Sequence, residues 1–227
     1  MRYTTVLFDA DNTLFDFSRA ERAALDDALT AFGVTPDEDK ARHYSAVNDM
    51  MWKKLERGEI SKSALRVARF EVFCRDYGLD VDVPALAVAY TDHLAEKAFL
   101  LPGALETCRI LSAFFNLYLI TNGLKTVQEK RFAASPLTPY FRGAFISEVM
   151  GAEKPDLAYF AAVARAIKRF DPDETLVVGD SLTSDMAGGI AAGLDTCWFN
   201  PRHLDGKGVP VTYTVDRLED VIPLVTA

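Results

Sequence analysis

The sequence predicts an α/β protein with a mostly parallel β-sheet and an inserted domain made only of helices. Two observations lead to this prediction. From residue 100 onward, short apolar runs of strand length alternate with helical stretches, which favours parallel strands joined by crossover helices. In addition, about a hundred residues separate the first strand-like run from the second, far more than one crossover helix needs. A separate helical domain is therefore expected between them.

Six apolar runs rich in β-prone residues are expected to form the strands of the sheet. In such sheets, ligands bind at the carboxyl ends of the strands, near the point where the strand order reverses. The polar residues that follow these runs are therefore the candidates for chemistry. The six runs are Thr5–Phe8, Leu117–Ile120, Ala144–Ile146, Leu176–Val178, Thr196–Phe199 and Val211–Val215.

The inserted segment, residues 16–98, is predicted to be a helical cap domain, and residues 1–15 and 99–227 are predicted to form the core. The first helix of the cap is expected to begin at Ser18, whose side chain would form a capping box with Glu21, and to stop at Gly33. The later cap helices are expected to open at Thr35-Pro36-Asp37-Glu38, to run from Ser61 to Tyr77 with Gly78 ending the helix, and to run from about Val83 to Phe99.

Composition excludes several classes of protein. Among 227 residues, 49% are hydrophobic and 26% are charged, which is typical of a globular protein. The formal net charge of −8 repels nucleic acid polymers and anionic membranes, so neither is expected as a partner. The three cysteines show no C-x-x-C spacing, so we expect buried thiols rather than disulfides or a zinc site.

The amino-terminal residues lead directly into the first apolar run and lack the features of a signal peptide. The longest apolar runs have the length of a strand and are too short to cross a membrane. A cytoplasmic protein is therefore expected.

Aspartates follow two of the predicted strands. The segment Asp9-Ala10-Asp11-Asn12-Thr13 follows the first strand, although Asp, Asn and Thr are also common in ordinary turns, so this motif alone leaves both interpretations open. Asp180 repeats the arrangement after Leu176–Val178. Asp185 lies near the start of the next helix, where a carboxylate could also serve only to stabilise the helix end.

A hydroxyl, an amide and a lysine complete the set of candidates. Thr121 and Asn122 end the second strand, and the free N–H groups of the following helix would stabilise an anion there, although Thr121 could also be a simple cap. Lys154 precedes Pro155, a favoured first helical residue, so its ammonium group would stand at an unfavourable helix start. A bound phosphate would compensate both positive charges.

If the sheet brings these residues together, several carboxylates converge and repel one another. A divalent cation would remove this repulsion. Because every candidate ligand is an oxygen donor, the sequence favours Mg²⁺ as the cofactor.

In order along the chain, Asp9-x-Asp11-x-Thr13, Thr121-Asn122, Lys154-Pro155 and Gly179-Asp180-x4-Asp185 resemble the motifs of the haloacid dehalogenase superfamily. The resemblance spans essentially the whole chain and implies a Rossmann-like core with a helical cap. It implies that Asp9 is the nucleophile that forms an aspartyl phosphate, and that Asp11 protonates the leaving oxygen and later activates water. It assigns substrate binding to Thr121, Asn122 and Lys154, and metal binding to Asp9, Asp11 (through its backbone carbonyl), Asp180 and Asp185.

Asp11 selects the reaction within this superfamily, because the metal-independent dehalogenases and the phosphonate-cleaving members lack a carboxylate at that position. The resemblance therefore implies a magnesium-dependent phosphomonoester hydrolase. Further segments are similar to the house-cleaning pyrimidine 5′-nucleotidase branch, which implies that a nucleoside 5′-monophosphate is the substrate. These segments are Val47-Asn48 with Trp52, Gly58-Glu59-Ile60, Arg69-Phe70, Ile146-Ser147-Glu148 and Cys197-Trp198-Phe199-Asn200.

Four aromatic residues of the cap, Phe17, Tyr44, Trp52 and Phe70, are compatible with a nucleotide substrate because they could stack on its base. Aromatic residues in a small helical domain also commonly fill its core, and that alternative stays open for each of them.

Other functions compete with this interpretation. A phosphomutase or a general sugar-phosphate phosphatase of the same superfamily would use the same residues. A phospho-accepting signalling module also combines strand-end aspartates, a hydroxyl and a lysine, but the motif order and the large insertion argue against it. A nucleotide-dependent kinase is disfavoured because no G-x-x-x-x-G-K-[ST] or G-x-G-x-x-G motif is present.

Overall fold

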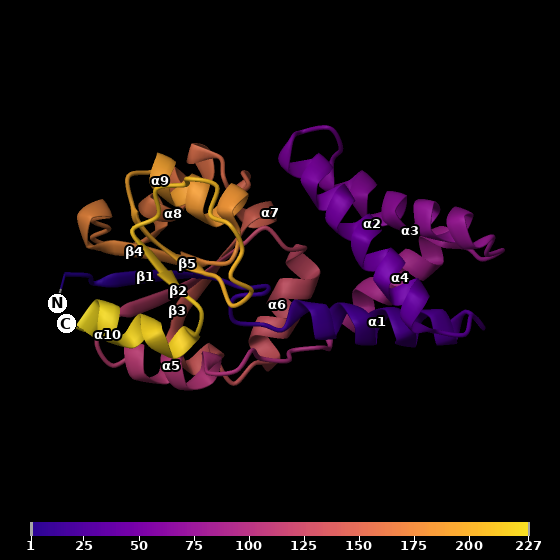
Figure 1. The fold of residues 1–227 in the computed structure, drawn as a ribbon, viewed down its shortest axis with the longest axis horizontal. Coiled ribbons are helices and arrows are strands. Elements are labelled where there is room, and N and C mark those ends of the chain that lie inside the picture. Colours follow the sequence, from indigo (N-terminus) through magenta and orange to yellow (C-terminus); the bar gives the residue numbers. More distant parts are fainter. Residues whose placement is uncertain (1, 227) are drawn as a thin grey trace. The chain divides into compact units, whose positions relative to one another are not determined.

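The computed structural model describes residues 2–226 and contains a six-stranded parallel sheet with helices on both faces (Figure 1). The strand order is β3-β2-β1-β4-β5-β6, and every neighbouring pair is parallel. The predicted fold class is confirmed. The strands are β1 (Thr5–Asp9), β2 (Asn116–Thr121), β3 (Phe141–Ile146), β4 (Thr175–Gly179), β5 (Asp195–Phe199) and β6 (Tyr213–Val215).

The strands carry apolar side chains on both faces, as a sheet covered on both sides requires. In β1, Val6 and Phe8 join one hydrophobic cluster, while Leu7 between them joins the other. The first cluster includes residues of the helices α5 (Ala104–Leu111) and α10 (Val221–Thr226), and the second includes residues of α8 (Leu157–Ala166). This two-sided burial fixes β1 in the centre of the sheet.

The last strand is shorter than expected, because it begins at Tyr213 rather than at Val211. The backbone N–H of Thr196 donates to the Thr212 hydroxyl at 3.0 Å, so a side chain replaces the backbone acceptor at this point. The remaining helices of the sheet unit are α6 (Lys125–Ala134), α7 (Ser147–Met150) and α9 (Ala187–Ala191), with short helical turns at Thr138–Tyr140, Pro172–Glu174, Leu182–Met186 and Leu218–Asp220.

The chain divides into two compact units. The sheet unit comprises the residues up to Phe17 and from Ala98 onward, and the helical unit comprises Ser18–Lys97. The helices that build the helical unit are α1 (Phe17–Ala31), α2 (Glu38–Glu56), α3 (Lys62–Tyr77) and α4 (Val83–Ala95).

Most helix ends of the helical unit follow their expected capping signals. Asp37 caps α2 and Ser61 caps α3, each by accepting a hydrogen bond from a backbone N–H group in the first turn. Gly78 ends α3 with a positive φ of 61°, the left-handed conformation that glycine adopts without strain. Local sequence therefore determines these boundaries.

Two expectations for the helical unit are wrong. Ser18 lies inside α1 instead of capping it, and the Glu21 side chain is buried, where it accepts a hydrogen bond from Asn48 Nδ2 at 2.7 Å. Helix α4 ends at Ala95, four residues before Phe99. Beyond Ala95 the chain is extended, and the Phe99 carbonyl accepts a hydrogen bond from the Asp16 N–H group. The segment that leads into α1 and the segment that follows α4 are thereby paired.

The aromatic residues of the helical unit mostly fill its core. Tyr44 and Phe70 are fully buried with ring centroids 4.9 Å apart, and both contact Tyr90. Of the two alternatives left open by the sequence, these two residues therefore follow the second and fill the core. Trp52 is half-buried and packs beside Met51 and its neighbours in a small apolar cluster.

Two expectations from composition also agree with the structure. Cys74, Cys108 and Cys197 are free and buried. Among the described residues, no helix is both long and apolar enough to cross a membrane.

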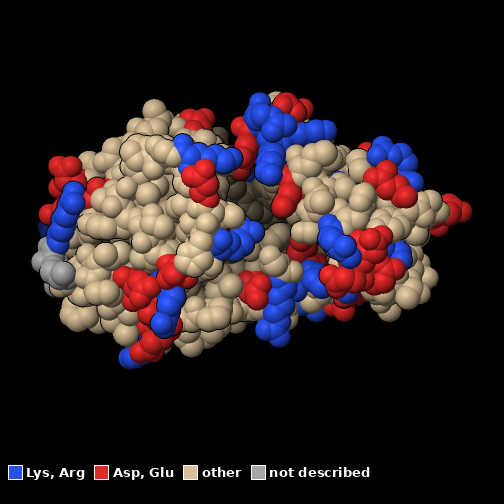
Figure 2. Space-filling model, in the orientation of Figure 1, with Lys and Arg blue, Asp and Glu red and all other residues tan. Residues whose placement is uncertain are grey.

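On the face drawn in Figure 2, positive and negative side chains are interspersed rather than separated into large areas of one sign.

Candidate active site

The central position of β1 brings three motifs to one edge of the sheet. Asp9 is the last residue of β1, and Thr121 is the last residue of β2 beside it. Asp180 directly follows β4, which pairs with β1 on the other side. The strand order reverses between β1 and β4, so these residues lie at the position where ligands bind in such sheets.

Lys154 is the centre of a buried charge network. Its Nζ atom donates to Asp9 Oδ1 and to Asp185 Oδ1, each at 2.6 Å. It also lies 3.4 Å from the Ile120 carbonyl oxygen, so the three hydrogens of the ammonium group have three acceptors. The second oxygen of Asp9 accepts from the Thr13 hydroxyl at 2.9 Å, which fixes the orientation of the Asp9 carboxylate.

The surroundings of Lys154 differ from the expected helix start. Helix α8 begins at Leu157 and is capped by Asp156, so Pro155 precedes the helix instead of opening it. The Asn122 side chain fixes the Lys154 backbone, accepting from its N–H group and donating to its carbonyl, both at 2.8 Å. In this structure the Asn122 amide therefore positions Lys154.

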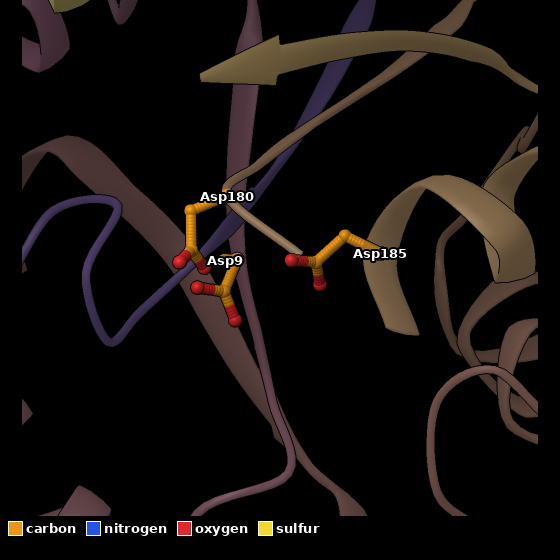
Figure 3. A group of neighbouring side chains, drawn as sticks. All are labelled: Asp9, Asp180 and Asp185. Carbon is orange, nitrogen blue, oxygen red and sulfur yellow. The ribbon is translucent and has the colours of Figure 1, made fainter. Parts of the chain in front are cut away.

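Three aspartates face one another (Figure 3): Asp9 at the end of β1, Asp180 directly after β4, and Asp185 in the helical turn that follows. One carboxylate oxygen from each of Asp9, Asp180 and Asp185 lies within 4.8 Å of the others. Asp185 is held in this arrangement by the Ser181 N–H group, which donates to its Oδ2 at 3.2 Å. The Asp180 backbone is anchored by Trp198, whose indole N–H donates to its carbonyl at 2.9 Å.

The charges of this cluster do not balance. Burial, followed by the charge of Asp185, raises the pKa of Asp9 to about 7 even though Lys154 lowers it. Burial and the charges of Asp9 and Asp185 raise the pKa of Asp180 well above its ordinary value. Burial lowers the pKa of Lys154, but the nearby carboxylates outweigh this effect and raise it above its ordinary value. One ammonium group thus faces three carboxylates.

A divalent cation fits this site on chemical grounds. The available ligands are carboxylate oxygens, which are the donors that Mg²⁺ prefers. A cation would also supply the positive charge that Lys154 alone does not provide.

Asp11 is not one of the three clustered aspartates, and its side chain has partners of its own. Its Oδ1 accepts from Arg131 Nη1 and its Oδ2 accepts from Gln128 Nε2, each at 2.5 Å. Both partners belong to α6. The Asp11 carboxylate, which the resemblance assigns to acid–base chemistry, is therefore fixed by a helix more than a hundred residues away in sequence.

Gln128 and Arg131 were missed by the sequence reasoning. The sequence pattern that could have indicated them is a pair of long polar side chains, three residues apart, on the face of α6 that also carries the buried Val127. Tyr159 was missed as well; its hydroxyl accepts from the Thr121 N–H at 3.2 Å and donates to the Phe145 carbonyl at 2.6 Å. It fixes the end of β2 where Thr121 lies.

Comparison with known families agrees with this site. A family model described as haloacid dehalogenase-like hydrolase matches residues 3–193. The chain belongs to the haloacid dehalogenase-like hydrolase family. The resemblance inferred from the motifs is thereby confirmed, and both Asp9, the last residue of β1, and Asp11 are part of the matched segment.

Two relatives within this family are pyrimidine 5′-nucleotidases. PynA of Streptococcus pneumoniae is 38% identical over 98% of this chain and 94% of its own length. YjjG of Escherichia coli is 33% identical over 99% of each chain. These matches extend through both the sheet unit and the helical unit.

A third relative, the HAD-hydrolase YfnB of Bacillus subtilis, is 38% identical over 97% of this chain and 94% of its own length. Its crystal structure, described as bound to magnesium, matches the present structure with a TM-score of 0.94 and 36% sequence identity over 100% of both chains. The fold of this family member is thus the fold described above.

Proposed function

We propose that this protein is a magnesium-dependent phosphomonoesterase that hydrolyses nucleoside 5′-monophosphates, with pyrimidine nucleotides preferred. The observation that carries the proposal is the different environment of Asp9 and Asp11. Asp9 lies in the charged cluster with Lys154, whereas Asp11 is held by α6. One carboxylate is thus available as a nucleophile and the other for proton transfer. The pyrimidine preference is supported by the names of PynA and YjjG.

The metal ligands in this proposal are Asp9, Asp180 and Asp185, with the backbone carbonyl of Asp11 as a further ligand. When bound, Mg²⁺ would neutralise the clustered carboxylates and the oxygens of the transferred phosphoryl group. The Lys154 ammonium group adds a buried positive charge on the same side, so a phosphate dianion could approach an ionised Asp9.

The residues of the chain then divide the reaction into two steps. An Asp9 carboxylate oxygen attacks phosphorus, the bond between phosphorus and the leaving oxygen breaks, and Asp11 gives its proton to that oxygen. Asp11 then takes a proton from a water molecule, which attacks the phosphorus of the aspartyl phosphate. Inorganic phosphate leaves and the Asp9 carboxylate is restored.

Thr121 is suited to bind the phosphoryl group. Its Oγ1 accepts hydrogen bonds from the Gly123 N–H and from Gln128 Nε2, each at 3.0 Å. Because a hydroxyl oxygen has two lone pairs, its own hydrogen remains to be donated to an anion. Asn122 contributes to the same site through the Lys154 backbone that it holds.

The domain roles are part of the proposal. Residues 1–15 and 99–227 would form the catalytic core, because every residue proposed above for chemistry belongs to them. Residues 16–98 would form the cap that selects the leaving group.

Phosphate release from a panel of nucleotides and sugar phosphates, measured with and without Mg²⁺, tests the function. We expect release from pyrimidine 5′-monophosphates that requires Mg²⁺, and its loss in Asp9→Asn. Asp80→Asn, the same change at an exposed aspartate, is the matched control and should retain full activity. Activity retained in Asp9→Asn would exclude Asp9 as the nucleophile, and isomerised sugar phosphate without phosphate release would identify a mutase.

A further inference from the structure

Helix α6 carries two buried polar side chains that the reaction above does not use directly. Gln128 is 1% exposed and Arg131 is fully buried. Burying such groups is unfavourable unless they are hydrogen-bonded or paired, and a core helix could carry apolar residues at both positions. Their contacts should therefore explain why polar residues occupy these positions.

Arg131 pairs with Asp11 and is itself held in place. Its Nη1 donates to Asp11 Oδ1 at 2.5 Å, and its guanidinium carbon lies 4.7 Å from the centroid of the Phe15 ring. Phe15 belongs to the same turn as Asp11, because the Asp11-to-Phe15 segment closes on itself through the Asn12 N–H, which donates to the Phe15 carbonyl at 2.8 Å. The arginine thus fixes both the carboxylate and the turn that carries it.

Gln128 connects Asp11 to the phosphate-binding hydroxyl. The two hydrogens of its Nε2 go to Asp11 Oδ2 at 2.5 Å and to Thr121 Oγ1 at 3.0 Å. This arrangement requires a glycine at position 123, because a Cβ atom there would lie 2.2 Å from Gln128 Nε2. A single amide group therefore fixes the distance between two side chains that must contact different parts of one substrate.

We propose that Arg131 and Gln128 are positioning residues for the acid–base step, an inference that rests on the proposed phosphomonoesterase function. Arg131 acts through Asp11 and through the turn that carries it. Gln128 acts through Asp11 and also directs the Thr121 hydroxyl hydrogen toward the phosphoryl group. The two residues thereby set the position from which Asp11 meets the leaving oxygen.

Substrates with different leaving groups can distinguish a role in positioning Asp11 from a purely structural role of Arg131 and Gln128. A nucleoside leaves through an alcohol oxygen, which must be protonated as the bond to phosphorus breaks. The phenolate of p-nitrophenyl phosphate leaves as an anion without a proton. A misplaced Asp11 should therefore lower kcat/KM for uridine 5′-monophosphate far more than for p-nitrophenyl phosphate, because kcat/KM reports only the steps up to formation of the aspartyl phosphate.

The first experiment measures both kcat/KM values, with Mg²⁺, for wild type, Arg131→Lys and Arg131→Met. The ratio of the two values in one preparation does not depend on the fraction of folded enzyme, so partial unfolding of a variant does not obscure the result. We expect the ratio of nucleotide to aryl phosphate to fall by roughly tenfold to a hundredfold, the loss associated with a misplaced catalytic group. Lys130→Met, an exposed position on the same helix, is the control and should leave the ratio unchanged.

A double-mutant cycle then tests whether Arg131 acts through Asp11. In the Asp11→Asn background, Arg131→Met should change kcat/KM for the nucleotide by no more than about twofold, because the group that it positions has already been removed. An equal loss in both backgrounds, or an unchanged substrate ratio in the Arg131 variants, would overturn the proposal.

Gln128→Ala should lower kcat/KM for both substrates, because it also releases the Thr121 hydroxyl, with the larger loss for the nucleotide. Gly123→Ala should reproduce this pattern by displacing the amide without removing it. Loss confined to p-nitrophenyl phosphate would contradict the role of Gln128. If wild type hydrolyses neither substrate, the proposed function itself fails; if it hydrolyses both and the variants keep its substrate ratio, only the present inference fails.

Discussion

At the scale of single residues, Asp9 and Asp11 acquire different environments although one residue separates them. Asp9 ends a buried strand and meets Lys154, whereas Asp11 lies beyond the strand and meets Arg131 and Gln128. The charged partner of Asp9, Lys154, comes from the loop before α8, and the partners of Asp11 come from α6. Two identical side chains are thereby suited to two chemical tasks.

The raised pKa of Asp9 predicts how metal binding should depend on pH. Because this pKa is about 7 in the metal-free protein, above the ordinary value of 3.8, the stability that Asp9 contributes is present at low pH and is lost as the pH rises through about 7. Mg²⁺ favours the ionised carboxylate, so its stabilising effect should grow over the same range. At about a hundredfold excess over Kd, stabilisation is about 2.7 kcal/mol, or roughly 5–10 °C in Tm.

Thermal unfolding in EDTA and in Mg²⁺, at about pH 6 and about pH 8, measures this effect. Asp180→Asn is the control, because it removes a proposed ligand together with one of the repelling carboxylates. This variant should be more stable than wild type in EDTA and should respond less to Mg²⁺. A Mg²⁺ effect of equal size at both pH values would contradict the assignment.

At the scale of elements, the end of β4 shows how the backbone controls the position of a charged side chain. Gly179 is the last residue of the strand, and Asp185 lies in the short helical turn that follows. A Cβ atom on Gly179 would lie 2.4 Å from Asp185 Oδ2 and 2.6 Å from its Cβ atom. The strand therefore needs glycine here so that Asp185 can approach Lys154.

Gly179→Ala should displace Asp185 and weaken Mg²⁺ binding by at least about tenfold, with a stability loss of about 1–3 kcal/mol from overpacking. Gly143→Ala in β3 is the matched control, because its Cβ atom would meet nothing closer than 3.9 Å. Calorimetric titration with Mg²⁺ and thermal unfolding compare the two variants. Equal metal affinity in both would show that the Gly179–Asp185 approach is not required.

At the scale of the whole molecule, the proposed chemistry and the inserted helices belong to different compact units. The proposed metal ligands are all in the sheet unit, and the helical unit has its own core around Tyr44 and Phe70. A ligand that binds only one unit should stabilise that unit first, because local opening reactions within a protein have separate free energies.

Hydrogen exchange measured by mass spectrometry can test this separation. Adding Mg²⁺ should slow exchange most in the peptides that span β4 and the following turn, residues 175–186, and least in those of α2 and α3, residues 38–77. Magnesium-free buffer that contains EDTA provides the reference state. An equal gain of protection in both sets of peptides would mean that the two units open as one.

Much of this architecture follows from the sequence alone. The apolar runs predicted six strands close to their observed positions, because each strand needs only a few neighbouring residues to define its burial. The helix ends at Asp37, Ser61 and Gly78 could also be predicted, because a helix cap depends only on residues next to it in the sequence. The order of the motifs predicted the family, since this chain carries its strand-end aspartates, its hydroxyl and its lysine in the same order as the motifs of the haloacid dehalogenase superfamily.

Tertiary structure decided which of these side chains meet and which polar residues are buried. The Asp11–Arg131 pair joins residues 120 positions apart, and local periodicity contains no information on that contact. Local periodicity likewise does not reveal that Glu21 binds Asn48 instead of forming a capping box with Ser18. Nor does it reveal that Tyr44 packs in a core instead of facing a ligand. Sequence determined the chemical groups and their order, because those depend on local patterns, whereas the three-dimensional packing assigned each group its partner.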